Sequence, residues 1–348
     1  MHENILNEIK GEISGKRKVR VAINGFGRIG RMIFRAGFND PEIEFVAIND
    51  LTSAKDLAYF LQYDSSQGSF EYKVLAQDDN LVIGDKKIAM IQVKNLEDLP
   101  WKKLKIDVVA ECTGLFTDSE KARKHIEQGA KKVLISAPGK GDDVFYLVRG
   151  ANDDEYNNQE IVSNGSCTTN SITAIINEIH KKYGIKKGMF ATVHSLTSDQ
   201  RLLDATHKSL RRGRAAPFNI VPTTTGAAQA VTKLIPELEG KFHGIAYRVP
   251  TPTGSVTDLN IELEKNVDKE EINHFLKHIC ENQLNGIIEY STEELVSSDI
   301  IGNPHSGIVD SVLTEVVNGN LVKLVVWYDN EFGFSNRMIE VIKIMSKK

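Results

Sequence analysis

One cysteine in a run of small polar residues is the clearest candidate for covalent chemistry in this chain. Cys167 stands within Asn-Gly-Ser-Cys-Thr-Thr-Asn (164–170), and apolar residues at helical spacing predict a helix from 171 to 183 directly after it. Free N–H groups and the helix dipole stabilise a thiolate there, so we expect an exposed, reactive side chain with a lowered thiol pKa. The alternative, an inert buried cysteine, is better matched by Cys280.

A nucleophilic thiol needs a base, and His194 is the candidate among the nine histidines of the chain. It ends the apolar run 189–193 just before a loop, whereas most other histidines stand among polar residues. A histidine at a strand end can face a nucleophile at another strand end. Single histidines are also commonly structural, so the residue pattern by itself leaves both readings open.

Two basic positions and a threonine-rich segment indicate a site for phosphate. Arg248 ends a short apolar strand, Arg212 lies in Arg-Arg-Gly-Arg (211–214), and Pro-Thr-Thr-Thr-Gly-Ala-Ala (222–228) precedes a helix. Guanidinium groups, hydroxyls and backbone N–H groups are the partners that a phosphate-bearing molecule requires. A solvated face remains the better interpretation for at least one arginine of 211–214.

A glycine-rich turn near the start predicts a dinucleotide site. Gly25, Gly27 and Gly30 form GxGxxG after a strand and before a helix, and Asp50 follows at the end of the next strand. This context favours a pyrophosphate at the helix N-terminus and a ribose diol on Asp50, whose charge repels a 2′-phosphate. We therefore expect NAD rather than NADP, with a purely structural glycine turn as the alternative.

The surrounding pattern predicts an α/β fold with a Rossmann-type doubly wound NAD-binding domain. A second, α+β domain with a mainly antiparallel sheet is expected from the strand-rich second half. The expected strands are 19–23, 44–48, 107–111, 132–136, 160–162, 186–196, 245–249, 256–263, 307–317 and 321–328, and the expected helices are 31–38, 119–128, 171–183, 228–234, 268–284 and 335–345.

Composition narrows the class of protein further. The 348 residues carry a net charge of −4, which argues against a dedicated nucleic-acid binder. Three widely spaced cysteines argue against a disulfide framework or a cysteine-built metal site, and no metal is expected. No apolar stretch is long enough to span a membrane, and residues 1–18 lack the apolar core of a signal peptide. We expect a cytoplasmic protein with a short N-terminal extension.

From about residue 19 to 345 the chain resembles the phosphorylating glyceraldehyde-3-phosphate dehydrogenases. The segments that carry the resemblance are INGFGRIGR, SNGSCTTN, HSLTSDQRLLD, LRRGRAA, PTTTGAAQAV, RVPTPTGSVTDL and WYDNEFGFSNRM. The resemblance implies that Cys167 attacks glyceraldehyde 3-phosphate and that His194 activates the thiol. NAD is then reduced, and inorganic phosphate releases 1,3-bisphosphoglycerate.

The same resemblance assigns the remaining binding residues. Thr197 and Arg248 would hold the substrate phosphate, and the attacking phosphate would be held by Ser166, Thr168, Arg212, Thr225 and Gly226. The residues implied for NAD are Gly25, Gly27, Arg28, Ile29, Gly30, Asp50, Lys94, Thr113, Ser136 and Asn330. It also implies a homotetramer, a cofactor domain of residues 1–166 plus 331–348, and a catalytic domain of residues 167–330.

Some positions depart from the family pattern and keep alternatives open. Ser171 stands where many members carry a second cysteine, and Phe334 replaces a common tyrosine. Ala205-Thr206 replaces a Leu-Pro pair of strict NAD users, which leaves some NADP use open. The alternatives are erythrose-4-phosphate dehydrogenase, suggested by 303–310 and Phe334, and a non-catalytic NAD- or RNA-binding protein.

Overall fold

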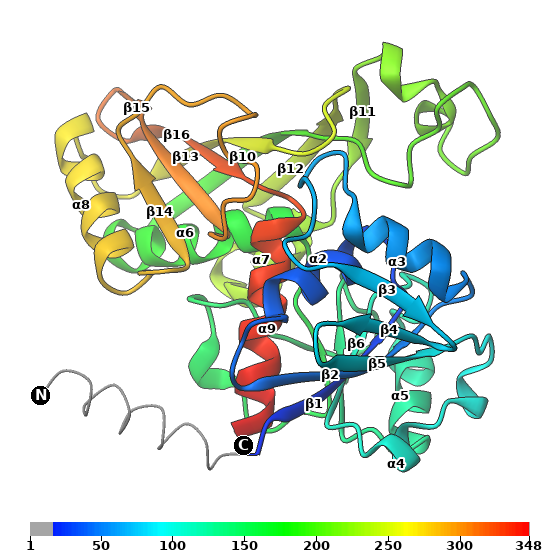
Figure 1. Ribbon diagram of the computed structural model, residues 1–348. Helices are drawn as coiled ribbons and strands as arrows, with labels where there is room; N and C mark the ends of the chain where they lie inside the picture. Colours follow the sequence, from blue (N-terminus) through cyan, green and yellow to red (C-terminus); the bar gives the residue numbers. More distant parts are fainter. Residues whose placement is uncertain (1–16, 348) are drawn as a thin grey trace, which may run out of the picture.

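The computed structural model describes residues 17–347. The predicted N-terminal extension therefore lies, over residues 1–16, outside the described residues. Within 17–347 the chain forms two sheets with helices packed against them (Figure 1). The largest clusters of buried apolar side chains, the first core and the second core, belong to the first and the second sheet respectively, and two smaller clusters also pack on the first sheet.

The first sheet is parallel over most of its width and becomes antiparallel at one edge. In spatial order its strands are β3 (Val74–Gln77), β4 (Asn80–Ile83), β5 (Lys86–Ile91), β2 (Ile43–Asn49), β1 (Val19–Asn24), β6 (Val108–Glu111), β7 (Lys132–Ile135), β9 (Ile161–Ser163) and β8 (Phe145–Tyr146). Its helices are α2 (Arg28–Gly37), α3 (Ala54–Gln62), α4 (Trp101–Leu104), α5 (Ser119–Glu127) and α9 (Phe332–Lys347).

The second sheet is mostly antiparallel, with two parallel pairings. Its strands are, in order, β11 (Val221–Thr224), β12 (Phe242–Arg248), β10 (Ile185–His194), β13 (Ser255–Leu263), β16 (Leu321–Tyr328), β15 (Gly307–Val317) and β14 (Ile288–Ser291). The helices of this part are α6 (Cys167–Tyr183), α7 (Ala227–Leu234) and α8 (Lys269–Glu281). The two sheets confirm the predicted fold class.

The glycine-rich turn joins β1 to α2, as its sequence predicts. Gly25 has φ +91°, a backbone conformation that favours glycine. A Cβ atom on Gly30 would lie 2.2 Å from the carbonyl oxygen of Gly25, so only glycine lets α2 pack this closely on the turn. By contrast, nothing lies within 4 Å of a Cβ atom built on Gly27. The third glycine therefore serves packing, and the second leaves open space at the helix N-terminus.

Helix α6 connects the two sheets. It follows β9 of the first sheet, and Ile172, Ile175, Ile176 and Ile179 are buried in the second core, the face predicted from the sequence. The helix begins at Cys167, earlier than the predicted start at residue 171. Ser166 explains the early start, because its hydroxyl accepts a hydrogen bond from Thr169 N at 3.1 Å and so caps the helix.

The last helix, α9, packs against α2 and shares the core of the first sheet through Met338, Val341 and Ile342. In Figure 1 it runs, in red, from beside the second sheet to beside β1. Residues from the two ends of the chain thus build one core. The domain boundaries at residues 166 and 330 stay a prediction.

We expect Gly30→Ala to lower the urea midpoint of unfolding, with a cost of about 1–3 kcal/mol or more, because the new methyl group meets the Gly25 carbonyl. Gly27→Ala is the matched control. Its φ of −68° suits alanine, so its cost should stay under about 1 kcal/mol. Equal midpoints for the two variants would contradict this account of the turn.

Candidate active site

The structure brings Cys167 and His194 together from a helix and a strand of the second part of the chain. Cys167 is the first residue of α6, and His194 is the last residue of β10. The sulfur of Cys167 lies 3.3 Å from Nε2 of His194, within hydrogen-bond distance for a thiol. A nucleophile and a base in contact form the minimal arrangement for covalent catalysis.

Burial shifts the pKa values of both members of this pair toward their neutral forms. Loss of hydration raises the pKa of the Cys167 thiol, although the charge of Arg248 and hydrogen bonds with Thr168 act to lower it. Burial and then the charge of Arg248 lower the pKa of His194 to about 3. The expectation from the sequence, a lowered pKa of the Cys167 thiol, is therefore wrong. Desolvation outweighs the helix terminus because the thiol, in a partly exposed residue, packs against the first core.

The second ring nitrogen of His194 has two neighbours. Nδ1 lies 2.8 Å from the carbonyl oxygen of Ser195 and 2.6 Å from Nη1 of Arg248. If Nδ1 donates to Ser195, Nε2 keeps a lone pair and can take the thiol proton. If Nδ1 accepts from Arg248, Nε2 carries the proton and donates to sulfur. The position of Arg248 thus selects the tautomer of His194.

Tyr328 is a neighbour of this pair that sequence reasoning missed. Its hydroxyl lies 2.9 Å from the hydroxyl of Thr168 and 2.6 Å from that of Thr192, so it links α6 to β10. Its ring packs edge-on against His194, with 6.0 Å between ring centroids. Burial raises the pKa of Tyr328, which keeps the phenol protonated. The only sequence signal was its place in the segment WYDNEFGFSNRM.

The predicted phosphate residues surround the pair from several elements. Arg248 ends β12 directly opposite His194 on β10. Arg212 donates to the Thr223 hydroxyl at 2.6 Å and pairs with Asp199 at 2.5 Å, and its charge contributes to lowering the pKa of Arg248. The two guanidinium groups are therefore neighbours, and one of them is already paired with a carboxylate.

The hydroxyls predicted to bind phosphate already have partners within the chain. Ser166 caps α6, and Thr168 contacts Tyr328. Thr197 donates to Gln200 at 2.8 Å, and the Thr225 hydroxyl accepts from Ala227 N. Gly226 caps α7. Each of these hydroxyls keeps a further lone pair or proton with which to bind an anion.

Most of the predicted NAD residues follow the carboxyl ends of β1, β2, β6 and β7, whereas Lys94 follows β5 and Asn330 follows β16 of the second sheet. Asp50 accepts hydrogen bonds from Phe26 N at 2.7 Å and Thr52 N at 2.9 Å, so it orders the glycine turn. The side chain of Arg28 is engaged by Asp64 and Glu331, which leaves its backbone and that of Ile29 at the start of α2. The open space above Gly27 suits the close approach of a pyrophosphate, so the residues fit a dinucleotide.

The remaining NAD residues differ in how firmly they are held. The Oδ1 atom of Asn330 accepts from Ser195 and Ser255, which orients its amide. Thr113 is bound to Glu111, and Ser136 N donates to the Glu111 carbonyl. Lys94 is exposed, and within residues 17–347 no hydrogen bond joins it to another predicted site residue.

Residues 17–347 lack both a cluster of metal ligands and a helix that could span a membrane. Over that range no group of three or more histidine, cysteine or acidic side chains could hold a metal ion. No helix in the described part of the chain is both long and apolar enough to cross a bilayer.

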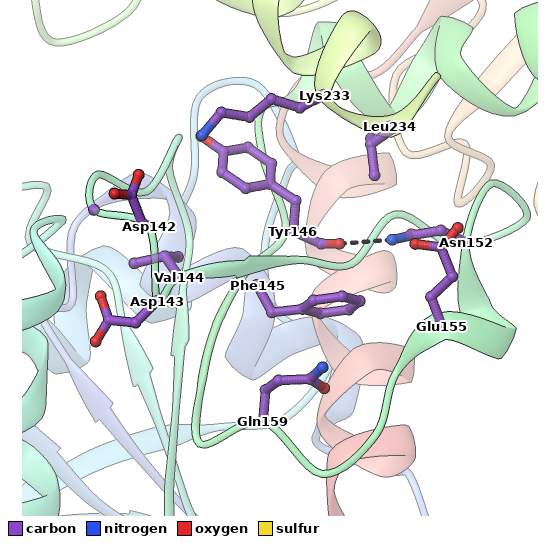
Figure 2. Close-up of a pocket in the computed structure, with 11 residues that line it drawn as sticks. Asp142, Asp143, Val144, Phe145, Tyr146, Asn152, Glu155, Gln159, Lys233 and Leu234 are labelled. Carbon is purple, nitrogen blue, oxygen red and sulfur yellow. Dashed lines mark hydrogen bonds between the residues drawn. The ribbon is translucent and has the colours of Figure 1, made fainter. Parts of the chain in front are cut away.

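A pocket of about 460 Å³ lies elsewhere, between β8 and α7. Figure 2 shows Lys233 of α7 reaching over the ring of Tyr146 of β8, with the Tyr146 carbonyl bonded to Asn152. None of the predicted site residues lines it. This pocket is therefore separate from the Cys167–His194 contact.

A dinucleotide-binding sheet with a cysteine–histidine pair beside it is the arrangement expected of a nicotinamide-dependent dehydrogenase. Family models for glyceraldehyde 3-phosphate dehydrogenase match residues 19–119 (NAD-binding domain) and 166–330 (C-terminal domain). The chain belongs to the glyceraldehyde-3-phosphate dehydrogenase family, and NAD is its cofactor.

Curated relatives agree with these family models over nearly the whole chain. The glyceraldehyde-3-phosphate dehydrogenase of Geobacillus stearothermophilus is 49% identical over 332 residues, which cover 95% of this chain and 99% of the relative. Glyceraldehyde-3-phosphate dehydrogenase 1 of Bacillus subtilis is 48% identical with the same coverage. The glyceraldehyde-3-phosphate dehydrogenase of Mycolicibacterium smegmatis is 48% identical over 339 residues, which cover 94% of this chain and 99% of the relative.

We expect Arg248→Gln to move the ionisation of Cys167 to higher pH. The guanidinium charge lowers the pKa of this thiol, so its loss removes a stabilising interaction with the thiolate. The measurement is the rate of iodoacetamide alkylation of Cys167 against pH, followed by mass spectrometry. Arg123→Gln, at an exposed ion pair, is the control, and a midpoint that stays in place or falls in Arg248→Gln would contradict the assignment.

Proposed function

We propose that this chain oxidises glyceraldehyde 3-phosphate to 1,3-bisphosphoglycerate, with NAD and inorganic phosphate, through a thioester on Cys167. The observation that carries the proposal is the 3.3 Å contact between the Cys167 sulfur and His194 Nε2, with Arg248 beside it. Family membership and the names of the relatives support the aldehyde and the cofactor.

In the first step the Cys167 sulfur forms a bond to the aldehyde carbon. The thiol proton passes through His194 Nε2 to the former carbonyl oxygen, which gives a hemithioacetal. A neutral histidine suits this role, because only an unprotonated Nε2 can accept the proton. An anionic phosphate held by Arg248 would draw the guanidinium from Nδ1 and favour the tautomer that donates to Ser195.

In the second step His194 takes the hydroxyl proton as the C–H bond breaks, which leaves a thioester on Cys167. When bound, NAD supplies the acceptor for the hydride that leaves this carbon. Asn330, whose Oδ1 is occupied by serine hydroxyls, presents its Nδ2 as a donor for the carboxamide of the cofactor. In the last step an oxygen of inorganic phosphate bonds to the thioester carbon and the C–S bond breaks. The thiolate regains a proton from His194, and the phosphate proton goes to solvent.

Two anion positions follow from this scheme. Arg248 and Thr197 would hold the phosphate of the aldehyde, and the attacking phosphate would bind near Ser166, Thr168, Arg212, Thr225 and Gly226. Arg212 supports this division because Asp199 already neutralises part of its charge, which suits a phosphate that must also leave as product. Arg248, which has no carboxylate partner in the described part of the chain, is the stronger anchor for the substrate.

We also propose that the chain works as a cytoplasmic homotetramer. The segment between β10 and β11 projects from the rest of the chain (Figure 1), and Leu202, Leu203 and Leu210 on it are exposed. Apolar side chains on a projecting segment favour a contact with another copy.

The proposed cytoplasmic location is supported by the cysteines. Cys112, Cys167 and Cys280 are unpaired thiols, which supports a reducing compartment.

We expect reduction of NAD to require both glyceraldehyde 3-phosphate and inorganic phosphate, because the thioester leaves the enzyme by phosphate attack. The measurement is steady-state NADH formation with and without phosphate, with erythrose 4-phosphate as the competing aldehyde. Equal rates without phosphate, or faster turnover of the four-carbon aldehyde, would favour erythrose-4-phosphate dehydrogenase instead.

We expect Cys167→Ser to abolish turnover while NAD binding persists, because a hydroxyl is a much poorer nucleophile than a thiol at neutral pH. His194→Asn should lower kcat by about 10²–10⁴, the usual contribution of a general base. Cys280→Ser, in a buried thiol of α8, is the matched control and should keep its activity. Turnover retained in Cys167→Ser would exclude this cysteine as the nucleophile.

A further inference from the structure

A buried polar network lies beneath the predicted NAD site, and the proposed reaction uses none of its members. We call it the Glu111 network; it consists of Asn24, Asn49, Trp101, Glu111 and His125. The asparagines and Glu111 end the strands β1, β2 and β6, while Trp101 begins α4 and His125 lies in α5. All five side chains are at least 95% buried.

Glu111 accepts a hydrogen bond from a donor on every side. Its Oε2 accepts hydrogen bonds from Asn24 Nδ2 at 2.6 Å and from His125 Nε2 at 3.1 Å. Its Oε1 receives Thr113 N at 2.8 Å and also the Thr113 hydroxyl. A carboxylate offers only acceptors and therefore satisfies all of these donors, whereas an amide would turn an N–H group toward one pair of them.

Trp101 determines which nitrogen of His125 carries the proton. The indole Nε1 can only donate, and it lies 3.0 Å from Nδ1 of His125, which must therefore accept. The proton of a neutral His125 is then on Nε2, directed at Glu111. Trp101 and His125 thus hold the carboxylate from the side opposite to Thr113.

The strand-end members of the network hold the segments that are predicted to bind NAD. The Asn49 side chain donates to the carbonyl oxygen of Val93 and accepts from Val93 N, at 2.9 Å each. Val93 directly precedes Lys94. Glu111 binds Thr113 directly. The predicted cofactor residues that adjoin the network in sequence or by hydrogen bond are Gly25 after Asn24, Asp50 after Asn49, Lys94 after Val93, and Thr113.

The Thr113 segment in turn supports the glycine turn. A Cβ atom on Gly25 would lie 2.7 Å from Thr113 N, so the two backbones are in contact. A shift of Thr113 would therefore move the turn that receives the pyrophosphate. The Thr113 hydroxyl also accepts from Leu115 N at 3.0 Å, which fixes the rest of this loop.

We propose that Glu111 is a positioning residue for NAD, and that His125 and Trp101 act through it. This inference rests on the NAD binding of the proposed function. Glu111 touches no reacting group, so its loss should weaken cofactor binding without altering the chemistry at Cys167. That separation distinguishes positioning of the cofactor from a general contribution to stability.

The test compares Glu111→Gln, His125→Leu and His125→Gln by calorimetric titration with NAD. Glu111→Gln and His125→Leu should weaken NAD binding by about tenfold, with a parallel rise in the KM for NAD. The KM for the aldehyde, kcat at saturating NAD and the alkylation rate of Cys167 should stay at the wild-type values. His125→Gln should restore binding, because glutamine supplies one donor for Glu111 and one acceptor for Trp101.

Two results would overturn the proposal. The first is a lower thermal midpoint in Glu111→Gln and His125→Leu with wild-type NAD affinity, which would make the network purely structural. The second, decisive if Glu111→Gln does not fold, is equal NAD affinity in His125→Leu and His125→Gln. A wild-type chain that does not bind NAD at all would instead contradict the proposed function, and with it the premise of this inference.

Discussion

The contact between the Cys167 thiol and the His194 imidazole depends on how α6 is held against β10. Cys167 packs against the core of the first sheet, whereas the rest of α6 is buried in the core of the second. His194 ends a strand of that second sheet. The 3.3 Å contact therefore requires that the first residue of α6 stay fixed relative to the end of β10. The buried isoleucine face of α6 and the Tyr328 bridge to β10 supply that rigidity.

Charge is a second constraint on the Cys167–His194 pair. Arg248 lies 2.6 Å from His194 and lowers the pKa of both the imidazole and the thiol, yet burial of the sulfur acts in the opposite direction and prevails. Burial therefore favours the neutral form of each group. An arginine without a carboxylate partner in the described part of the chain leaves excess positive charge beside the thiol, and in the proposed reaction the phosphate of the substrate would compensate it.

Much of the fold followed from the sequence wherever the pattern was strong. The strand, glycine turn and helix of β1 and α2 were predicted within a few residues, as were α5 and the strands β10, β12, β13, β15 and β16, whereas the edge strands β11 and β14 of the second sheet were not predicted. The antiparallel edge of β3, β4 and β5 was missed, because β3 buries one of its residues and exposes the rest. The prediction for Cys167 placed it correctly at a helix N-terminus, but its pKa was wrong because sequence does not reveal desolvation.

The sequence alone determined the residue types that chemistry needs and the strands and helices that carry them. Cys167 before an apolar helical stripe, the three glycines with Asp50, and the arginines near hydroxyls are local patterns, and local physics explains them. Only the tertiary structure decided which histidine meets the thiol, how Arg248 shares His194 with Ser195, and that Glu111 lies among donors beneath the predicted cofactor site. These three arrangements depend on contacts between residues that are distant in the chain. Packing of the two cores determines such contacts, and the periodicity of the sequence does not reveal them.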